Sequence, residues 1–268
     1  MTIIAMGREL GSRGKTVAEA VAEVLGASLI HYEIIDHLAD RSRVRKSHVA
    51  RLLEPGIDPF VPLTSEDTLP TMLSATEIFD IASIPEDVVL RGWGAVALLR
   101  GVRHVARVRI TAPLENRVRN LMADFKGVDE ARVREEIALF DEAHAAVMKR
   151  HFNVDYRDPA LYELVLDTSQ TPVFECANHI VEFTRARRNV ETNTSRLRLV
   201  SLSTEAHVTA LLRLHPPTRP LKIDVAAQGG AVTLSGMVPS TDLRIRCEEV
   251  AWRVPGIESV NNELSVAA

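Results

Sequence analysis

Cysteine and aromatic residues are scarce in this chain of 268 residues, and their scarcity excludes several classes of protein. Only Cys176 and Cys247 occur, far apart and without neighbouring ligands, which excludes a disulfide scaffold and a cysteine-rich zinc site. Aromatic residues make up 4% and do not alternate with basic ones, so surfaces that stack RNA bases are not expected. The H-E-x-x-H pattern of zinc proteases and the G-x-S-x-G pattern of serine hydrolases are also missing.

The chain has a nearly balanced charge and no long apolar segment. The formal net charge is −4 and the sequence pI is about 6.2, so no global attraction to nucleic acid or to an anionic membrane is expected. No apolar run approaches the ~18 residues of a membrane-spanning helix. The apolar residues at 1–6 are too few for a signal peptide. We therefore expect a soluble, cytoplasmic protein that binds no nucleic acid, and a role at a membrane surface is not the leading expectation.

The order of the apolar segments predicts an α/β domain. A run of apolar, β-branched residues at 2–6 is typical of a buried parallel strand, and helical spacing begins at Lys15 and stops at Gly26. Further elements are expected in the same alternating order, as strands at 88–90, 106–110 and 164–167, a helical hairpin over 113–152 and a last helix over 172–185. The arginines within 106–110 suggest an edge strand or a strand end. Four prolines within 54–70 indicate an irregular excursion.

The two helices of the expected hairpin are separated by Gly127, and Phe125 is expected in an apolar stripe with Leu121. Beyond residue 185 the sequence becomes polar and basic, which is typical of a linker over 186–203. The remaining residues follow the order helix, strand, strand, helix, strand. Ser203 is expected to cap the first of these helices.

A glycine-rich segment carries the sharpest chemical signal, because it follows a buried strand and opens a helix. It reads Gly11-Ser12-Arg13-Gly14-Lys15-Thr16. Glycines let backbone N–H groups approach a triphosphate closely, and the helix N-terminus adds positive potential. Lys15 would contact the β- and γ-phosphates, and the Thr16 hydroxyl would bind Mg²⁺. A Walker loop requires glycine five positions before Gly14, where this chain has Glu9. A tight turn with a helix cap is the alternative interpretation.

The segment from Met6 to Thr16 resembles the opening signature of the cytidylate kinase-like family, P-loop relatives of nucleoside monophosphate kinases. The similarity continues at 25–26, 33–35, 89–95 and 112–117, and ends near 162 and 167–169. The departure from Walker spacing is a trait of that family. The resemblance implies a P-loop kinase-type parallel sheet flanked by helices, with a helical lid over about 116–150, in a domain of residues 1–185.

The resemblance also implies the ligands and their binding residues. ATP with Mg²⁺ would be the donor and a nucleoside monophosphate the acceptor. Arg117 and Asp141 match family positions in the lid and, with Lys15, are expected to be catalytic. The donor nucleotide would be held by the loop residues Arg8, Gly11, Ser12, Arg13, Gly14, Lys15 and Thr16.

The acceptor side departs from the family pattern at three positions. The arginine of the family's G-R-G motif is Trp93 here, the aspartate expected before Glu33 is His31, and an expected lid arginine is His144. Arg91, two residues before Trp93, would face the same side by strand alternation. Arg41 is a second candidate for the acceptor phosphate, its alternative being a solvent-exposed helix end. Either the acceptor differs from CMP or the protein binds nucleotide with little transfer.

Residues 204–268 resemble a BON domain, a small α+β module that binds ligands, partners or phospholipids. The segments 229–238 and 254–264 carry the resemblance. The leading hypothesis is thus a nucleoside monophosphate kinase-type phosphotransferase with an appended BON module for an unknown ligand or protein partner. A catalytically weak nucleotide-binding regulator that acts through this module is the alternative. A third hypothesis, membrane-surface binding through the module and the linker, predicts salt-sensitive binding to anionic vesicles.

Overall fold

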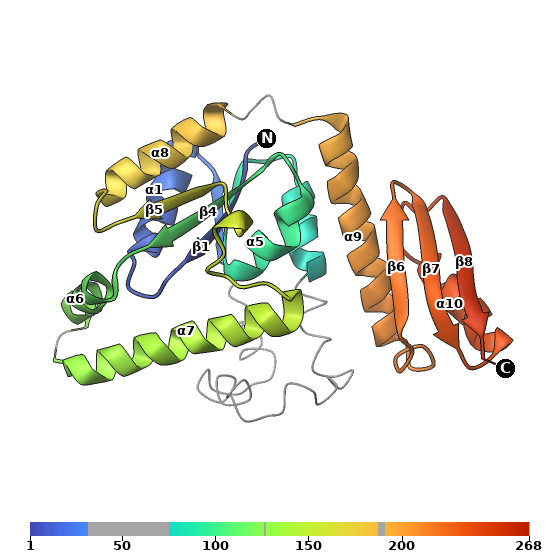
Figure 1. The fold of residues 1–268 in the computed structure, drawn as a ribbon. Helices are drawn as coiled ribbons and strands as arrows, with labels where there is room; N and C mark the ends of the chain where they lie inside the picture. The colour runs from blue at the N-terminus through green and yellow to red at the C-terminus, as the bar shows by residue number, and fades with distance from the viewer. Residues whose placement is uncertain (32–74, 126, 187–190, 268) are drawn as a thin grey trace. The chain divides into compact units, whose positions relative to one another are not determined.

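The computed structural model describes residues 1–31, 75–125, 127–186 and 191–267 (Figure 1). These residues form two compact units. The first contains residues 1–31 and the described part of 85–191, and the second contains residues 75–84 and 192–267. The boundaries expected at 185 and 204 stay a prediction. Among the described residues, no helix is both long enough and apolar enough to span a membrane.

The first unit is built on a five-stranded parallel sheet with the strand order β2-β3-β1-β4-β5. This sheet and its flanking helices confirm the predicted α/β class. The elements are β1 (Ile3–Arg8), α1 (Gly14–Leu25), β2 (Ser28–His31), β3 (Val88–Arg91), α5 (Trp93–Leu98), η1 (Leu99–Gly101), β4 (Val105–Thr111), α6 (Leu114–Asp124), α7 (Glu130–Phe152), η2 (Pro159–Leu161), β5 (Leu164–Asp167) and α8 (Val173–Ala186).

Helices α1 and α8 lie side by side on one face of this sheet (Figure 1). Alternate residues of the central strands, such as Ile4 and Val108, pack against Val21 of α1 and Ile180 of α8, and all four are fully buried. Helix α1 ends where expected, because Gly26 adopts the left-handed C-cap conformation. The packed helices and strands fix the loop between β1 and α1 at the carboxyl edge of the sheet.

The arginines of β4 suggested an edge strand or a strand end, and the first of these alternatives is wrong. The strand lies between β1 and β5. A charged side chain is tolerated inside a sheet when a partner compensates its charge. Arg109 pairs with Glu9, and Arg107 lies 3.6 Å from the carboxylate of Glu163.

Helices α6 and α7 form the predicted hairpin, and Gly127 lies between them with φ 84°. Their interface buries Val118, Val133 and Ile137, and Leu10 of the loop after β1 packs against the same cluster. The expectation for Phe125 is wrong: it lies at the C-cap of α6 with 60% of its surface exposed, because the helix ends before its side chain can turn inward.

The second unit contains a helix over residues 75–83 and the three-stranded sheet of the C-terminal module, in the order β6-β7-β8. Its elements are α9 (Asn193–Leu214), β6 (Ile223–Gln228), β7 (Ala231–Val238), α10 (Thr241–Ala251) and β8 (Ser259–Val266). Ser203 lies inside α9 and does not cap it, contrary to expectation. The helix begins ten residues earlier, because Thr192 and Ser195 form a reciprocal capping box.

Both edge strands of the small sheet are covered at one point by a helix side chain. Glu205 of α9 accepts a hydrogen bond from the backbone N–H of Ala227 in β6, at 3.1 Å. Arg244 of α10 donates to the backbone carbonyl of Asn262 in β8, at 2.9 Å. Charged groups at a sheet edge hinder pairing with a further strand. The small sheet is therefore protected against edge-to-edge association.

Leu234 of β7 is fully buried in the core of the second unit, whereas 65% of Met237 on the same strand is exposed. We expect Leu234→Ala to lower the stability of this unit by about 2–5 kcal/mol, because it leaves a cavity. Faster hydrogen exchange of the β6, β7 and β8 amides would report this loss. Met237→Ala is the matched control, and equal effects of the two variants would contradict the packing described here.

Candidate phosphate-binding site

The loop between β1 and α1 has the backbone of an anion-binding turn. Gly11 has φ 80° and Arg13 has φ 60°, both left-handed, and Arg13 is the N-cap of α1 without a side-chain cap. Alternating backbone conformations of this kind direct successive N–H groups to one side, and the first turn of α1 adds N–H groups without partners in the helix. The predicted glycine-rich segment thus forms a loop suited to phosphate oxygens.

Two glycines of the loop are required by close packing. A Cβ atom at Gly11 would lie 2.6 Å from the backbone oxygen of Arg117 in α6. A Cβ atom at Gly14 would lie 2.6 Å from the Cβ of Arg8. A Cβ atom essentially never makes contacts this short. Only glycine therefore lets the loop approach α6 and lets α1 begin against β1.

Lys15 and Thr16, the expected phosphate and Mg²⁺ contacts, are both exposed in the first turn of α1. The Lys15 ammonium lies 3.8 Å from the carboxylate of Glu19, one helical turn further on, with 67% of the side chain exposed. Exposed pairs of this kind contribute little energy, so the ammonium is free to exchange Glu19 for a more highly charged phosphate.

Glu9, at the position where a Walker loop has glycine, is a buried carboxylate that fastens the loop to the end of β4. It accepts hydrogen bonds from the Thr111 hydroxyl at 2.6 Å and the Ala112 N–H at 3.3 Å, and it pairs with Arg109. The sequence showed only the departure from the Walker pattern. The structure shows the role of the residue at this position, because its carboxylate anchors the loop.

Two tyrosines surround the guanidinium of Arg109. Its central carbon lies 5.8 Å from the ring centres of both Tyr156 and Tyr162, within range of cation–π attraction. Burial raises the pKa of both phenols, and the charge of Asp141 raises that of Tyr156 further. The rings stay neutral at physiological pH, so neither tyrosine adds a charge beside the Arg109–Glu9 pair.

Arg117 and Asp141, both expected to be catalytic, are brought together in the structure. The buried Arg117 guanidinium donates two hydrogen bonds to the Asp141 carboxylate, at 2.7 and 2.8 Å. Its Nε donates to the carbonyl of Leu10 at 2.7 Å, and its Nη1 lies 3.9 Å from Glu9. Arg117 thereby links the loop to α7. A catalytic role for either residue stays a prediction.

Three further side chains contact the loop, and sequence analysis assigned none of these contacts. Asn120 of α6 donates to the carbonyl of Gly11 at 2.8 Å, and Thr168, just after β5, donates to that of Ser12 at 2.9 Å. Asp124 accepts from Arg13 at 2.7 Å. The sequence signals for them are that Asn120 lies one helical turn after Arg117, and that Thr168 follows a strand at the carboxyl edge within the last segment of the family resemblance.

The candidates for the acceptor side are placed differently. Arg91 ends β3, opposite Met6 in the register with β1 and opposite His31 in that with β2, and is 8% exposed. Arg41 lies outside the described residues. The Arg8 guanidinium lies 5.7 Å from the ring centre of Phe140, which in turn stacks on the buried His144 of α7. Arg8 is therefore directed toward α7.

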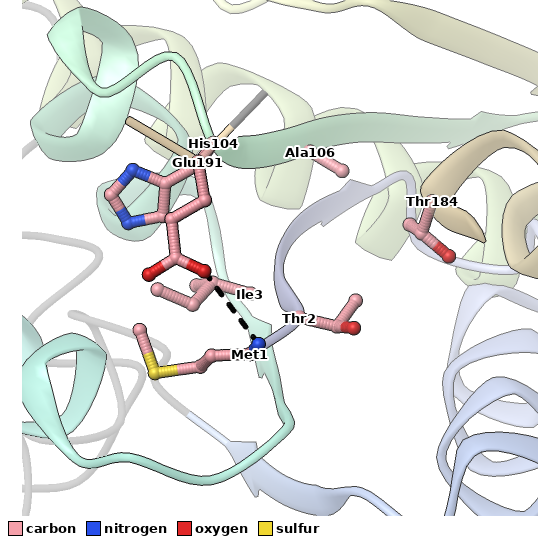
Figure 2. A pocket seen from close by; sticks show the side chains of 7 residues that line it. All are labelled: Met1, Thr2, Ile3, His104, Ala106, Thr184 and Glu191. Carbon is pink, nitrogen blue, oxygen red and sulfur yellow. Dashed lines mark ion pairs between the residues drawn. The ribbon is translucent and has the colours of Figure 1, made fainter. Parts of the chain in front are cut away.

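A small cavity lies at the opposite, amino edge of the sheet, where Ile3 and Ala106 begin their strands near His104 and Glu191 (Figure 2). Its volume of about 10 Å³ accommodates about one water molecule. The cavity is too small for a nucleotide. Among the described residues, no group of three or more histidine, cysteine or acidic side chains is arranged to hold a metal ion.

Comparison with known proteins gives two family matches. Residues 3–170 match the cytidylate kinase-like family, and residues 203–268 match the BON domain. A search of curated proteins found no match.

Solved structures match part of this chain, and the first described here shares the fold of the first unit. An uncharacterized protein from Eubacterium ventriosum is 20% identical with a TM-score of 0.54, and the match covers 69% of this chain and 98% of that one. A shikimate kinase from Acinetobacter baumannii, in complex with shikimate, is 16% identical with a TM-score of 0.40, covering 70% and 95%. A shikimate kinase from Bacteroides thetaiotaomicron is 14% identical with a TM-score of 0.42, covering 69% and 98%.

Removal of the buried guanidinium is expected to be costly. Arg117→Ala leaves the Asp141 carboxylate, which is only 20% exposed, without its partner, and we expect a loss of about 3–5 kcal/mol in unfolding free energy, measured by urea denaturation. Arg134→Ala is the control on the same hairpin. Arg134 makes two hydrogen bonds to Glu115 at the hairpin surface, where water screens the pair, so its loss is expected to be much smaller. Similar losses for the two variants would contradict the role given to Arg117.

Proposed function

Because the chain belongs to the cytidylate kinase-like family, we propose that its first unit is an ATP-dependent phosphotransferase of the nucleoside monophosphate kinase type. The observation that carries this proposal is the loop before α1, where left-handed Gly11 and Arg13 precede the exposed Lys15 and Thr16. The reaction would transfer the γ-phosphoryl group of ATP to a phosphate oxygen of a nucleoside monophosphate, with ADP as the leaving group.

The residues of the loop fit a magnesium–triphosphate ligand. Gly11 and Gly14 let the loop pack closely against α6 and β1, and the N–H groups of the loop and of the first turn of α1 would bind the phosphate oxygens. Lys15 would neutralise the β- and γ-phosphates, and the Thr16 hydroxyl would hold Mg²⁺ together with phosphate oxygens and water. When bound, Mg²⁺ neutralises part of the negative charge of the triphosphate.

The hairpin of α6 and α7 supports transfer in this proposal by fixing the loop. Phosphoryl transfer depends mainly on positioning and charge neutralisation, so a loop held in one conformation lowers the barrier. Arg117 would hold the loop carbonyl of Leu10 while Asp141 orients its guanidinium. Arg91 and Arg41 would contact the acceptor phosphate, and the lid would exclude water.

A second candidate function is favoured by the burial of Arg91, which is 8% exposed, while Lys15 is largely exposed. Lys15 of the donor site is thus open to a ligand, whereas the arginine expected to contact the acceptor is covered. This arrangement suits a regulator that binds nucleotide and transfers little phosphate. In both cases the BON module would bind a ligand or a protein partner and connect it to the nucleotide state. Both proposals place the protein in the cytoplasm, where ATP and Mg²⁺ are available.

The role of Lys15 provides the most direct test. We expect Lys15→Ala to weaken binding of Mg·ATP by about 10–100-fold, because a charge-assisted contact to the phosphates is lost. Calorimetric titration measures the affinity, and a coupled assay with a panel of nucleoside monophosphates measures transfer. Glu19→Ala, which removes only the surface partner of Lys15, serves as control. Unchanged ATP binding by the Lys15 variant would contradict both functions, and ATP binding without transfer to any monophosphate would leave only the regulator.

The conformation of Gly11 provides a second test. Gly11→Ala is expected to weaken Mg·ATP binding by about 10-fold or more, because a left-handed backbone costs a non-glycine residue roughly 1–2 kcal/mol and the new methyl meets α6. Gly26→Ala is a matched control, since Gly26 is also left-handed but nothing lies within 4 Å of the added Cβ. Equal affinities for the two variants would show that loop geometry does not determine binding.

A further inference from the structure

Three consecutive carbonyl groups of the phosphate loop are each held by a side chain from a distant part of the chain. Arg117 Nε donates to the carbonyl of Leu10, Asn120 Nδ2 to that of Gly11, and Thr168 Oγ1 to that of Ser12. The donors are 107, 109 and 156 residues away in sequence. Loop carbonyls commonly face solvent, so three side-chain donors in succession indicate that the direction of these groups matters.

The direction of a carbonyl determines the direction of the next N–H group. A peptide bond is planar and trans, so its C=O and N–H point in opposite directions. Holding the carbonyls of Leu10 and Ser12 toward α6 and the end of β5 turns the N–H groups of Gly11 and Arg13 to the other side of the loop. The N–H of Ser12 closes a turn onto the carbonyl of Glu9 at 3.2 Å. The loop therefore presents donors to an anion and keeps its acceptors away from it.

We propose that Asn120 and Thr168 are positioning residues for the phosphate-binding loop, which they keep in the donor-presenting conformation without touching the ligand. This inference rests on the proposed function, because it requires that the loop bind phosphate. Both residues are themselves fixed in place. The Asn120 carbonyl accepts from Arg13 at 3.4 Å, and the Thr168 N–H donates to the carbonyl of Thr111 in β4 at 3.0 Å.

The inference follows from an energetic asymmetry. If a carbonyl of the loop turned toward the ligand, it would place a partial negative charge against phosphate oxygens and remove an N–H donor from them. Each side-chain hydrogen bond that prevents this contributes about 0.5–1.5 kcal/mol, and without the bonds part of that free energy is lost from binding. The same bonds should affect any ligand with a polyphosphate, whatever its base.

The experiment compares four variants of the full chain with two probes, Mg·ATP and magnesium tripolyphosphate, by calorimetric titration. Thr168→Val removes the hydroxyl and keeps the shape, and Thr168→Ser keeps the hydroxyl. Asn120→Leu removes the amide, and Asn116→Leu makes the same change one turn earlier on α6, as a matched control. Urea denaturation of each variant shows that it is folded.

We expect Thr168→Val and Asn120→Leu each to lower the affinity for both probes by about 5–10-fold. The affinities of Thr168→Ser and Asn116→Leu are expected to stay within about 2-fold of that of the parent protein. An equal loss of affinity for the two probes would show that the variants affect binding of the phosphates, which the two probes share. Parent-like affinities for Thr168→Val and Asn120→Leu would overturn the inference, as would a Thr168→Ser variant as weak as Thr168→Val. Failure of the proposed function looks different, because the parent protein would then bind neither probe.

Discussion

A buried guanidinium, that of Arg117, joins the parts of the first unit on which the candidate site depends. It contacts the phosphate loop through the carbonyl of Leu10, α7 through Asp141, and the loop anchor Glu9 at 3.9 Å. Arg109 pairs with the other carboxylate oxygen of Glu9. Two arginines and two carboxylates thus form one buried network, and burial makes each charge costly without its partners. The conformation of the loop is consequently determined by the position of the hairpin.

This arrangement divides the charged residues of the site into two groups. The buried network lies beneath and beside the loop, where protein groups compensate its charges. Lys15 and Thr16 are exposed in the first turn of α1. A site for a triphosphate needs both kinds, because fixed N–H groups lower the cost of reorganisation while a mobile ammonium follows the transferred group. Glu9 makes this division possible, since it anchors the loop without occupying the side that a ligand would approach.

Sequence analysis found what lies close together along the chain and missed what folding brings together. The strand, loop and helix from β1 to α1 were predictable because glycine, lysine and threonine follow one another within six positions. Arg109 was taken as a sign of an edge strand, because the carboxylate that compensates it is 100 residues away. Asn120 and Thr168 lie in an ordinary helix and an ordinary turn, and only the fold places them on the loop. The capping box of Thr192 and Ser195 was overlooked because the surrounding polar residues are typical of a linker.

The second unit shows how the C-terminal module presents itself to a partner. Each of its two edge strands has one backbone group that is already hydrogen-bonded to a helix side chain. Glu205 bonds to the N–H of Ala227, and Arg244 bonds to the carbonyl of Asn262. A strand added to either edge would have to displace a charged side chain from a backbone group, which costs at least the hydrogen bond it replaces. Recognition through side chains carries no such cost. Strand addition at either edge is therefore disfavoured at these two positions.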